Sequence, residues 1–181
     1  MSEKRNLSTK KIVFSAAAVA LATVTANFIK LPSLPAGGSA SLFSMLFICL
    51  VGYWYGPVTG ISAALAHGLI QFISNPYIVH PLQVILDYFL AFGALGLSGF
   101  FSKSKKGLIK GYTAGVLGRF TFSTLSGMIF FTEYIGSTAD KMFAVWAGIW
   151  YNLSYIGLEY VLTMIVLTVP AVRKGLSSIN K

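Results

Sequence analysis

The chain has 181 residues, of which 55% are hydrophobic, 14% aromatic and only 10% charged. Soluble domains contain about 25% charged residues, so this sequence has too few charges to cover a soluble surface and indicates a protein embedded in lipid. Its net charge of +9 does not indicate a nucleic-acid partner, because the Lys and Arg residues fall between apolar stretches. The single cysteine, Cys49, lies inside an apolar run, which excludes a disulfide framework.

Six apolar segments have the length, or nearly the length, that a helix needs to cross a membrane. Crossing about 30 Å of hydrocarbon takes roughly 20 helical residues, and lipid leaves no backbone group unpaired. The first segment continues to Phe28 without an A-x-A cleavage site, so we expect a retained helix and not a signal peptide. The sequence predicts an all-α integral membrane protein that forms a single membrane domain over residues 1–181, with approximate spans at 11–29, 41–55, 57–74, 82–101, 111–131 and 142–168.

The basic residues predict the orientation of these spans. Of the 14 Lys and Arg residues, four lie at the N-terminus, four lie between the fourth and fifth spans, and three lie in the tail. Six spans place these three segments on one side, which the positive-inside rule assigns to the cytoplasm. We therefore expect both termini in the cytoplasm, with short loops at 30–40, 75–81 and 132–141 outside that could act as lids.

Small residues form a strip along the first span. Alanines recur there at four-residue spacing, and in lipid such a strip lets a second helix approach closely. Two interpretations stay open, namely contact with another helix of the same chain and docking of a partner subunit. The alanines concerned are Ala16, Ala18, Ala20, Ala22 and Ala26.

Four ionisable residues lie well inside the predicted spans and should face protein or a cavity, because a charge that faces lipid is costly. At ~1.5 Å per residue, Arg119 and Glu159 both lie about 12–14 Å from the cytoplasmic ends of their spans, so we expect an ion pair between them. His67 lies in the third span. Asp87 lies nearer the outside without a positive partner, where it could receive a cationic ligand or be hydrogen-bonded to Tyr or Asn side chains.

Aromatic residues gather at the predicted depth of Asp87. A carboxylate among aromatic rings suits a flat cationic ligand, through Coulomb attraction, stacking and cation–π contact. On the last span, Gly148, Asn152, Tyr155 and Glu159 are spaced by four, three and four residues, so they share one face, which should look inward. The candidates around Asp87 are Tyr77, Tyr88, Phe131, Trp146, Trp150 and Asn152.

The sequence lacks the residue patterns that membrane enzymes require. Its two histidines, His67 and His80, are thirteen residues apart and do not match paired metal ligands at helical spacing. It also lacks a Walker-type phosphate loop, so ATP-driven transport would need another chain. We expect no enzymatic activity, no cofactor and no metal.

Four segments between about residues 36 and 156 resemble the thiamine-specific S-component family of energy-coupling factor vitamin transporters, in the same order. The most specific pattern is HPLQ-x-x-LDY, which is followed by the glycine-rich end of span four and by SG-x-x-FF in span five. The segments read LPAGGSAS, NPYIVHPLQVILDYFLAFGALGLSGFF, GRFTFSTLSGMIFFTEY and WYNLSY.

The resemblance implies a substrate-binding subunit in the bacterial cell membrane that captures thiamine at the extracellular face. Such a subunit associates with a transmembrane coupling subunit and two cytoplasmic ATPases, and the alanine strip of span one would dock the coupling subunit. The resemblance also implies that Asp87 faces the positive thiazolium. The other positions that match the family's binding pattern are Tyr88, Tyr77, Gly127, Phe131 and Asn152.

Two positions depart from the family pattern. Ser123 stands where the family commonly has a histidine, and Ala147 stands where it commonly has a tyrosine, for which Trp146 or Trp150 could compensate. An S-component for a related pyrimidine or pyridine vitamin or precursor therefore stays open. So does a stand-alone channel or secondary carrier, which would be expected to show inverted repeats or paired helix breaks.

Overall fold

A computed structural model of the protein describes residues 2–31, 39–135 and 141–179, and the regular structure of this part is helical. Lys30 and Ser41 form an isolated antiparallel bridge at the edges of the first gap. The helical elements in chain order are α1 (Ser2–Phe28), α2 (Ser44–Tyr55), α3 (Pro57–Ser74), α4 (Pro81–Val84), η1 (Ile85–Leu90), α5 (Ala91–Gly93), η2 (Ala94–Phe101), α6 (Gly107–Ile135), α7 (Lys141–Thr168) and α8 (Pro170–Ser178).

These helices coincide with the six apolar segments to within a few residues, except at the predicted fifth and first spans, where the helices extend further. The fourth segment is one continuous rod made of α4, η1, α5 and η2. By length and apolar composition, three described segments could cross a membrane, namely Thr9–Phe28, Pro57–Ser74 and Pro81–Phe101. The pair Val145–Thr168 and Pro170–Ser178, bent by 90°, raises this number to four, and α2 is a shorter apolar helix of 12 residues.

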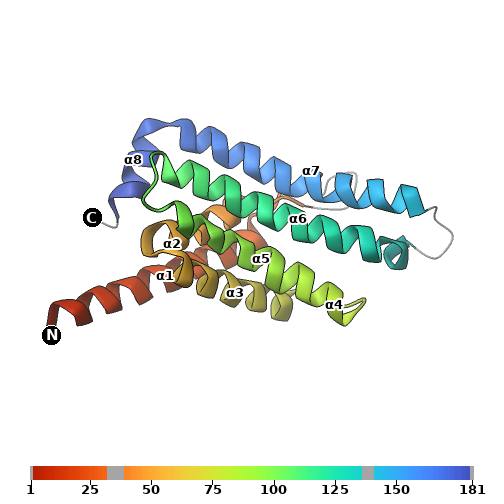
Figure 1. The fold of residues 1–181 in the computed structure, drawn as a ribbon, viewed down its shortest axis with the longest axis horizontal. Coiled ribbons are helices and arrows are strands. Elements are labelled where there is room, and N and C mark those ends of the chain that lie inside the picture. Colours follow the sequence, from red (N-terminus) through yellow and green to blue (C-terminus); the bar gives the residue numbers. More distant parts are fainter. Residues whose placement is uncertain (1, 32–38, 136–140, 180–181) are drawn as a thin grey trace.

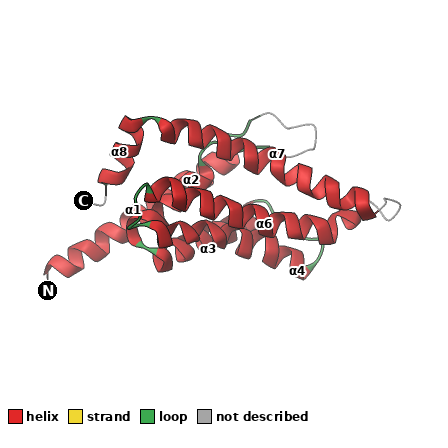
Figure 2. Cartoon of the chain, turned by 45° about the horizontal axis from the view of Figure 1, so that its top comes forward, coloured by secondary structure: helices red, strands yellow, loops and turns green. Residues whose placement is uncertain are grey.

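The bundle has a clear polarity along its long axis (Figure 1). The helices that carry the two chain ends, α1 and α8, lie at the same end, and the beginning of α6 lies there too. Figure 2 shows α4 at the opposite end. Helix α6 packs against α7 and η2, whereas α2 and α3 pack on η2 and α1 packs on both of them.

Glycines make the contact between η2 and α3. Because η2 is a 3₁₀-helix, residues three apart lie on one face, and Gly96 and Gly99 have this spacing. A Cβ atom on Gly96 would lie 2.4 Å from the Ile61 nitrogen, and one on Gly99 would lie 2.4 Å from the Pro57 nitrogen. The two backbones therefore touch directly, which is how small residues bring helices together in lipid.

We expect Gly96→Ala to destabilise the bundle, because the added methyl group meets backbone that cannot move aside. Overpacking of this kind costs about 1–3 kcal/mol. The thermal unfolding of the detergent-solubilised protein measures the loss. Gly157→Ala is the control, since its Cβ would meet only the flexible Leu153 side chain, at 3.4 Å. Equal unfolding temperatures for the two variants would contradict this account of the contact.

Candidate functional site

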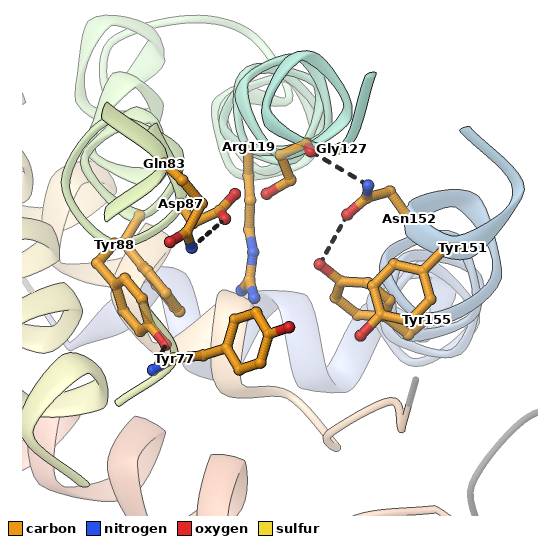
Figure 3. A pocket seen from close by; sticks show the side chains of 11 residues that line it. Tyr77, Gln83, Asp87, Tyr88, Arg119, Gly127, Tyr151, Asn152 and Tyr155 are labelled. Carbon is orange, nitrogen blue, oxygen red and sulfur yellow. Dashed lines mark hydrogen bonds between the residues drawn. The ribbon is translucent and has the colours of Figure 1, made fainter. Parts of the chain in front are cut away.

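A cavity of about 460 Å³ lies between η1, α6 and α7, a size that suits a small organic ligand. Its walls are rich in phenol rings and contain one carboxylate and one guanidinium group (Figure 3). The lining residues are Tyr77, Gln83, Asp87, Tyr88, Phe92, Arg119, Ser123, Gly127, Tyr151, Asn152 and Tyr155.

The carboxylate of Asp87 comes from a π-helical turn. In η1 the N–H of Ala91 donates to the carbonyl of Leu86, five residues back, and such turns are frequent at functional sites. The Asp87 Oδ2 atom accepts hydrogen bonds from Gln83 Nε2 at 2.7 Å and from Ser126 Oγ at 3.0 Å. Because both donors bind Oδ2, the second oxygen of Asp87 has no hydrogen-bond donor within the described part of the chain.

Tyr88 connects the cavity wall to the segment between α3 and α4. Its hydroxyl group donates to the carbonyl of Asn75 at 2.8 Å and accepts the backbone N–H of Tyr77 at 3.1 Å. Its ring packs edge-on against Phe72, with 5.1 Å between the centroids. Tyr88 therefore fixes the backbone that presents Tyr77 to the cavity.

Helices α6 and α7 meet closely at two glycines beside the cavity. A Cβ atom on Gly148 would lie 3.1 Å from the carbonyl carbon of Gly127. One turn further along α7, Asn152 Nδ2 donates to the carbonyls of Gly148 at 2.9 Å and Ser123 at 3.2 Å, and Asn152 Oδ1 accepts from the Tyr155 hydroxyl at 2.9 Å. This face of α7 looks inward, as its spacing predicts.

Six of the nine residues predicted for binding line this cavity. They are Tyr77, Asp87, Tyr88, Ser123, Gly127 and Asn152. Trp146 and Trp150 do not line it, since they are 55% and 62% exposed. The side chain of Phe131 lies outside the described part of the structure, as do residues 32–38 and 136–140 of the loops expected to act as lids. Ligand binding by these residues stays a prediction.

The prediction of binding residues missed five residues that line the cavity, although helical spacing points to most of them. Gln83 lies one turn before Asp87, and Arg119 lies one turn before Ser123 on α6. The missed residues are Gln83, Phe92, Arg119, Tyr151 and Tyr155.

The expected ion pair between Arg119 and Glu159 is wrong. The guanidinium carbon of Arg119 lies 4.3 Å from the centroid of the Phe92 ring, in the cavity. Glu159 is 3% exposed and accepts hydrogen bonds at the beginning of α2, from Met45 N–H at 2.8 Å and from the hydroxyl groups of Ser41 at 2.9 Å and Ser44 at 3.1 Å. A carboxylate is favourable there because a helix N-terminus has unpaired N–H groups and a partial positive charge.

His67 lies in the interior and joins helices, with no role in the cavity wall. It is 1% exposed, its Nδ1 atom lies 3.2 Å from Thr23 Oγ1, and its ring packs edge-on against Phe92 with 5.2 Å between the centroids. Across residues 2–31, 39–135 and 141–179, no three His, Cys, Asp or Glu side chains come together in a way that could hold a metal ion.

The alanine strip of α1 has two sides. Ala18 and Ala22 are buried against the rest of the chain, as the intramolecular interpretation expects. Ala16 and Ala20 are exposed and line a groove of about 690 Å³ between α1 and α3. This division leaves one side of the strip accessible to another helix.

The apolar helices and the cavity define a helical membrane protein with a cavity of a size that suits a small ligand. The family model of the thiamine transporter protein (Thia_YuaJ) matches residues 12–177. Thiamine transporter ThiT of Bacillus subtilis (strain 168) is 36% identical over 170 residues, which cover 86% of this chain and 84% of that protein. The chain therefore belongs to the thiamine transporter family.

A solved structure has the same fold. The structure of ThiT from Listeria monocytogenes superimposes on this chain with a TM-score of 0.67 and covers 93% of this chain and 98% of its own, at 24% sequence identity. The arrangement of the helices is thus that of a ThiT structure.

We expect Glu159→Ala to lower the thermal stability of the protein, because it removes the acceptor for three donors, two of which are buried. Each donor left without a partner costs about 1–3 kcal/mol. Glu159→Gln is the matched variant, since its amide oxygen can still accept the Met45 N–H, so it should unfold between wild type and Glu159→Ala. The measurement is thermal unfolding in detergent. An alanine variant as stable as wild type would show that Glu159 does not hold the beginning of α2.

Proposed function

We propose that this protein is the substrate-binding S-component of an energy-coupling factor importer, and that its cavity binds thiamine. The observation that carries the proposal is the uncommitted oxygen of Asp87 in a cavity ringed by phenols. Thiamine carries a flat, permanently cationic thiazolium ring, which a carboxylate attracts strongly away from water and aromatic faces attract further. The name of the Bacillus subtilis relative, a thiamine transporter, supports the same ligand.

The two departures from the family pattern leave this proposal intact. Tyr151 lies one turn beyond Ala147 on α7 and brings a phenol ring to the cavity that Ala147 cannot supply. Ser123 offers a hydroxyl group where the family commonly has an imidazole, so it retains a polar contact for the ligand but loses a ring for stacking. Asp87 favours the cationic thiamine over a neutral pyrimidine or pyridine vitamin.

We also propose six membrane spans in one domain of the bacterial plasma membrane, with both termini in the cytoplasm. The spans are α1, α2, α3, the rod from α4 to η2, α6 and α7. The end of the bundle that carries α8 and the beginnings of α1 and α6 also carries the three basic segments, which supports this orientation (Figure 1). The cavity, near the end where α4 begins, would then receive thiamine from outside.

The energy for uptake would come from partner chains. In this proposal a transmembrane coupling subunit docks on the exposed side of the alanine strip, and two ATPases drive release of the vitamin into the cell. The groove between α1 and α3 supports this site, because Ala16 and Ala20 leave room for a helix to approach.

We expect Asp87→Asn to weaken thiamine binding by about tenfold to a hundredfold, because it removes the charge that faces the thiazolium. Isothermal titration of the detergent-solubilised protein with thiamine measures the affinity directly. Glu159→Gln is the control, since it removes a buried carboxylate outside the cavity. If both variants lost affinity equally, or if wild type did not bind thiamine, the proposed function would be wrong.

We expect Ala20→Leu to reduce thiamine uptake by cells about tenfold while leaving thiamine binding by the purified protein unchanged, because the larger side chain fills the docking groove. The control is Ala17→Leu, at an exposed position of α1 outside the groove. Uptake of labelled thiamine and co-purification of the coupling subunit report the effect. Normal uptake with Ala20→Leu would place the docking surface elsewhere.

A further inference from the structure

Helix α8 lies across the direction of the spans. It is bent by 90° from the end of α7, and it lies at the end of the bundle that also carries the beginnings of α1 and α6 (Figure 1). Nine residues are too few for a helix to be stable alone in water, so contacts with the rest of the chain must hold α8. The carbonyl of Leu176 accepts the indole N–H of Trp54 at 2.7 Å, which fixes α8 to the end of α2. Its axis therefore runs along the membrane surface when α7 spans the membrane.

Aromatic side chains mark the level of the membrane surface at this end. Phe14 packs edge-on against Trp54 with 6.5 Å between the ring centroids, and Trp54 packs edge-on against Tyr55 at 6.2 Å. The ammonium group of Lys10 lies 5.9 Å from the centroid of the Phe14 ring. Trp and Tyr gather where hydrocarbon meets the lipid headgroups, because their rings are apolar and their tips are polar. Since Trp54 binds α8 directly, α8 lies at the level of the headgroups.

The two sides of α8 differ in polarity. Val172, Leu176 and Ile179 are spaced by four and three residues, so they share one face. Leu176 and Ile179 pack against the core of the bundle, whereas Lys174 and Ser178 are exposed. A helix with an apolar face and a basic polar face that lies along the membrane surface is typical of helices that contact lipid headgroups.

The same end of the bundle carries a large excess of positive charge. Residues 1–11, 103–110 and 173–181 contain four, four and three Lys or Arg residues, and Glu3 is the only acidic residue in these segments. The four lysines of the second segment are exposed, and Arg173 on α8 is half-buried. The sequence thus provides almost no carboxylates here to neutralise these charges, so an anionic partner is attracted by many of them together.

We propose that α8 and residues 103–110 form a surface that binds the headgroups of anionic phospholipids, with Arg173 and Lys174 as the contacts from α8. Each Lys or Arg near an anionic membrane surface strengthens the attraction, and the bond from Trp54 holds α8 at that surface. This position favours a lipid over an acidic protein as the partner. Under the proposed orientation the lipids belong to the cytoplasmic leaflet, and the inference rests on that orientation and not on the ligand of the cavity.

The test is the binding of phosphatidylglycerol, which is anionic, and of phosphatidylcholine, which is zwitterionic, to the detergent-solubilised protein, followed by native mass spectrometry. We expect the double variant Arg173→Gln, Lys174→Gln to bind phosphatidylglycerol about tenfold to thirtyfold more weakly than wild type, since each charge contributes roughly fivefold. Its affinity for phosphatidylcholine should not change. The matched control is Lys30→Gln, Lys141→Gln, which removes two charges near the other ends of α1 and α7.

A loss of phosphatidylglycerol affinity that is confined to the α8 variant supports the inference. Arg173→Lys keeps the charge and should keep the affinity, which separates loss of charge from loss of the fold. Equal affinity of wild type for the two lipids would overturn the inference and leave an acidic protein surface as the partner of this end. An equal loss in the control variant would also overturn it. Because a micelle has no inside and outside, no result here depends on the proposed orientation or on thiamine binding.

Discussion

The direct contact between the backbones of η2 and α3 is the constraint on which the rest of the structure depends. With no side chain between them at Gly96 and Gly99, their separation is set by the main chain alone. Helix α2 joins the same unit, because Ser98 Oγ donates to the carbonyl of Cys49 at 2.8 Å. Since η1 continues through α5 into η2, and α6 packs on η2, this one close contact positions two walls of the cavity.

The ionisable groups of the interior differ in how completely the protein satisfies them. Glu159 is surrounded by donors at the beginning of α2, so its hydrogen-bonding capacity is used within the fold. Among the described residues, Asp87 has donors at one oxygen, and Arg119 contacts an aromatic face but has no hydrogen-bond acceptor. Inside a membrane protein an unpaired polar group is costly, so this difference separates the group that holds helices together from the groups that face the cavity.

The sequence predicts the helix positions well because lipid demands long apolar segments with polar or Pro/Gly boundaries. It does not predict α8, whose amphipathic turns are too short for a span, or the change from π- to 3₁₀-helix, which depends on packing. Depth along the axis suggested that Arg119 meets Glu159, but depth does not say which neighbour a side chain faces. Trp150 was expected near the ligand but does not line the cavity. It lies two residues before Asn152, and residues two apart do not share a helix face, so it lies on the other side of α7.

The π-helical turn η1 separates two tasks within one rod. In an α-helix each residue rotates the side-chain direction by about 100° around the axis. One additional residue in a wide turn therefore rotates the residues after the turn relative to those before it. The face of η2 that carries the glycines and the side of the rod that carries Gln83 therefore do not follow one regular helical repeat. A helix without this wide turn would aim the carboxylate at position 87 toward a different neighbour, so the path of the backbone, as well as the residue type, sets the direction of the Asp87 side chain.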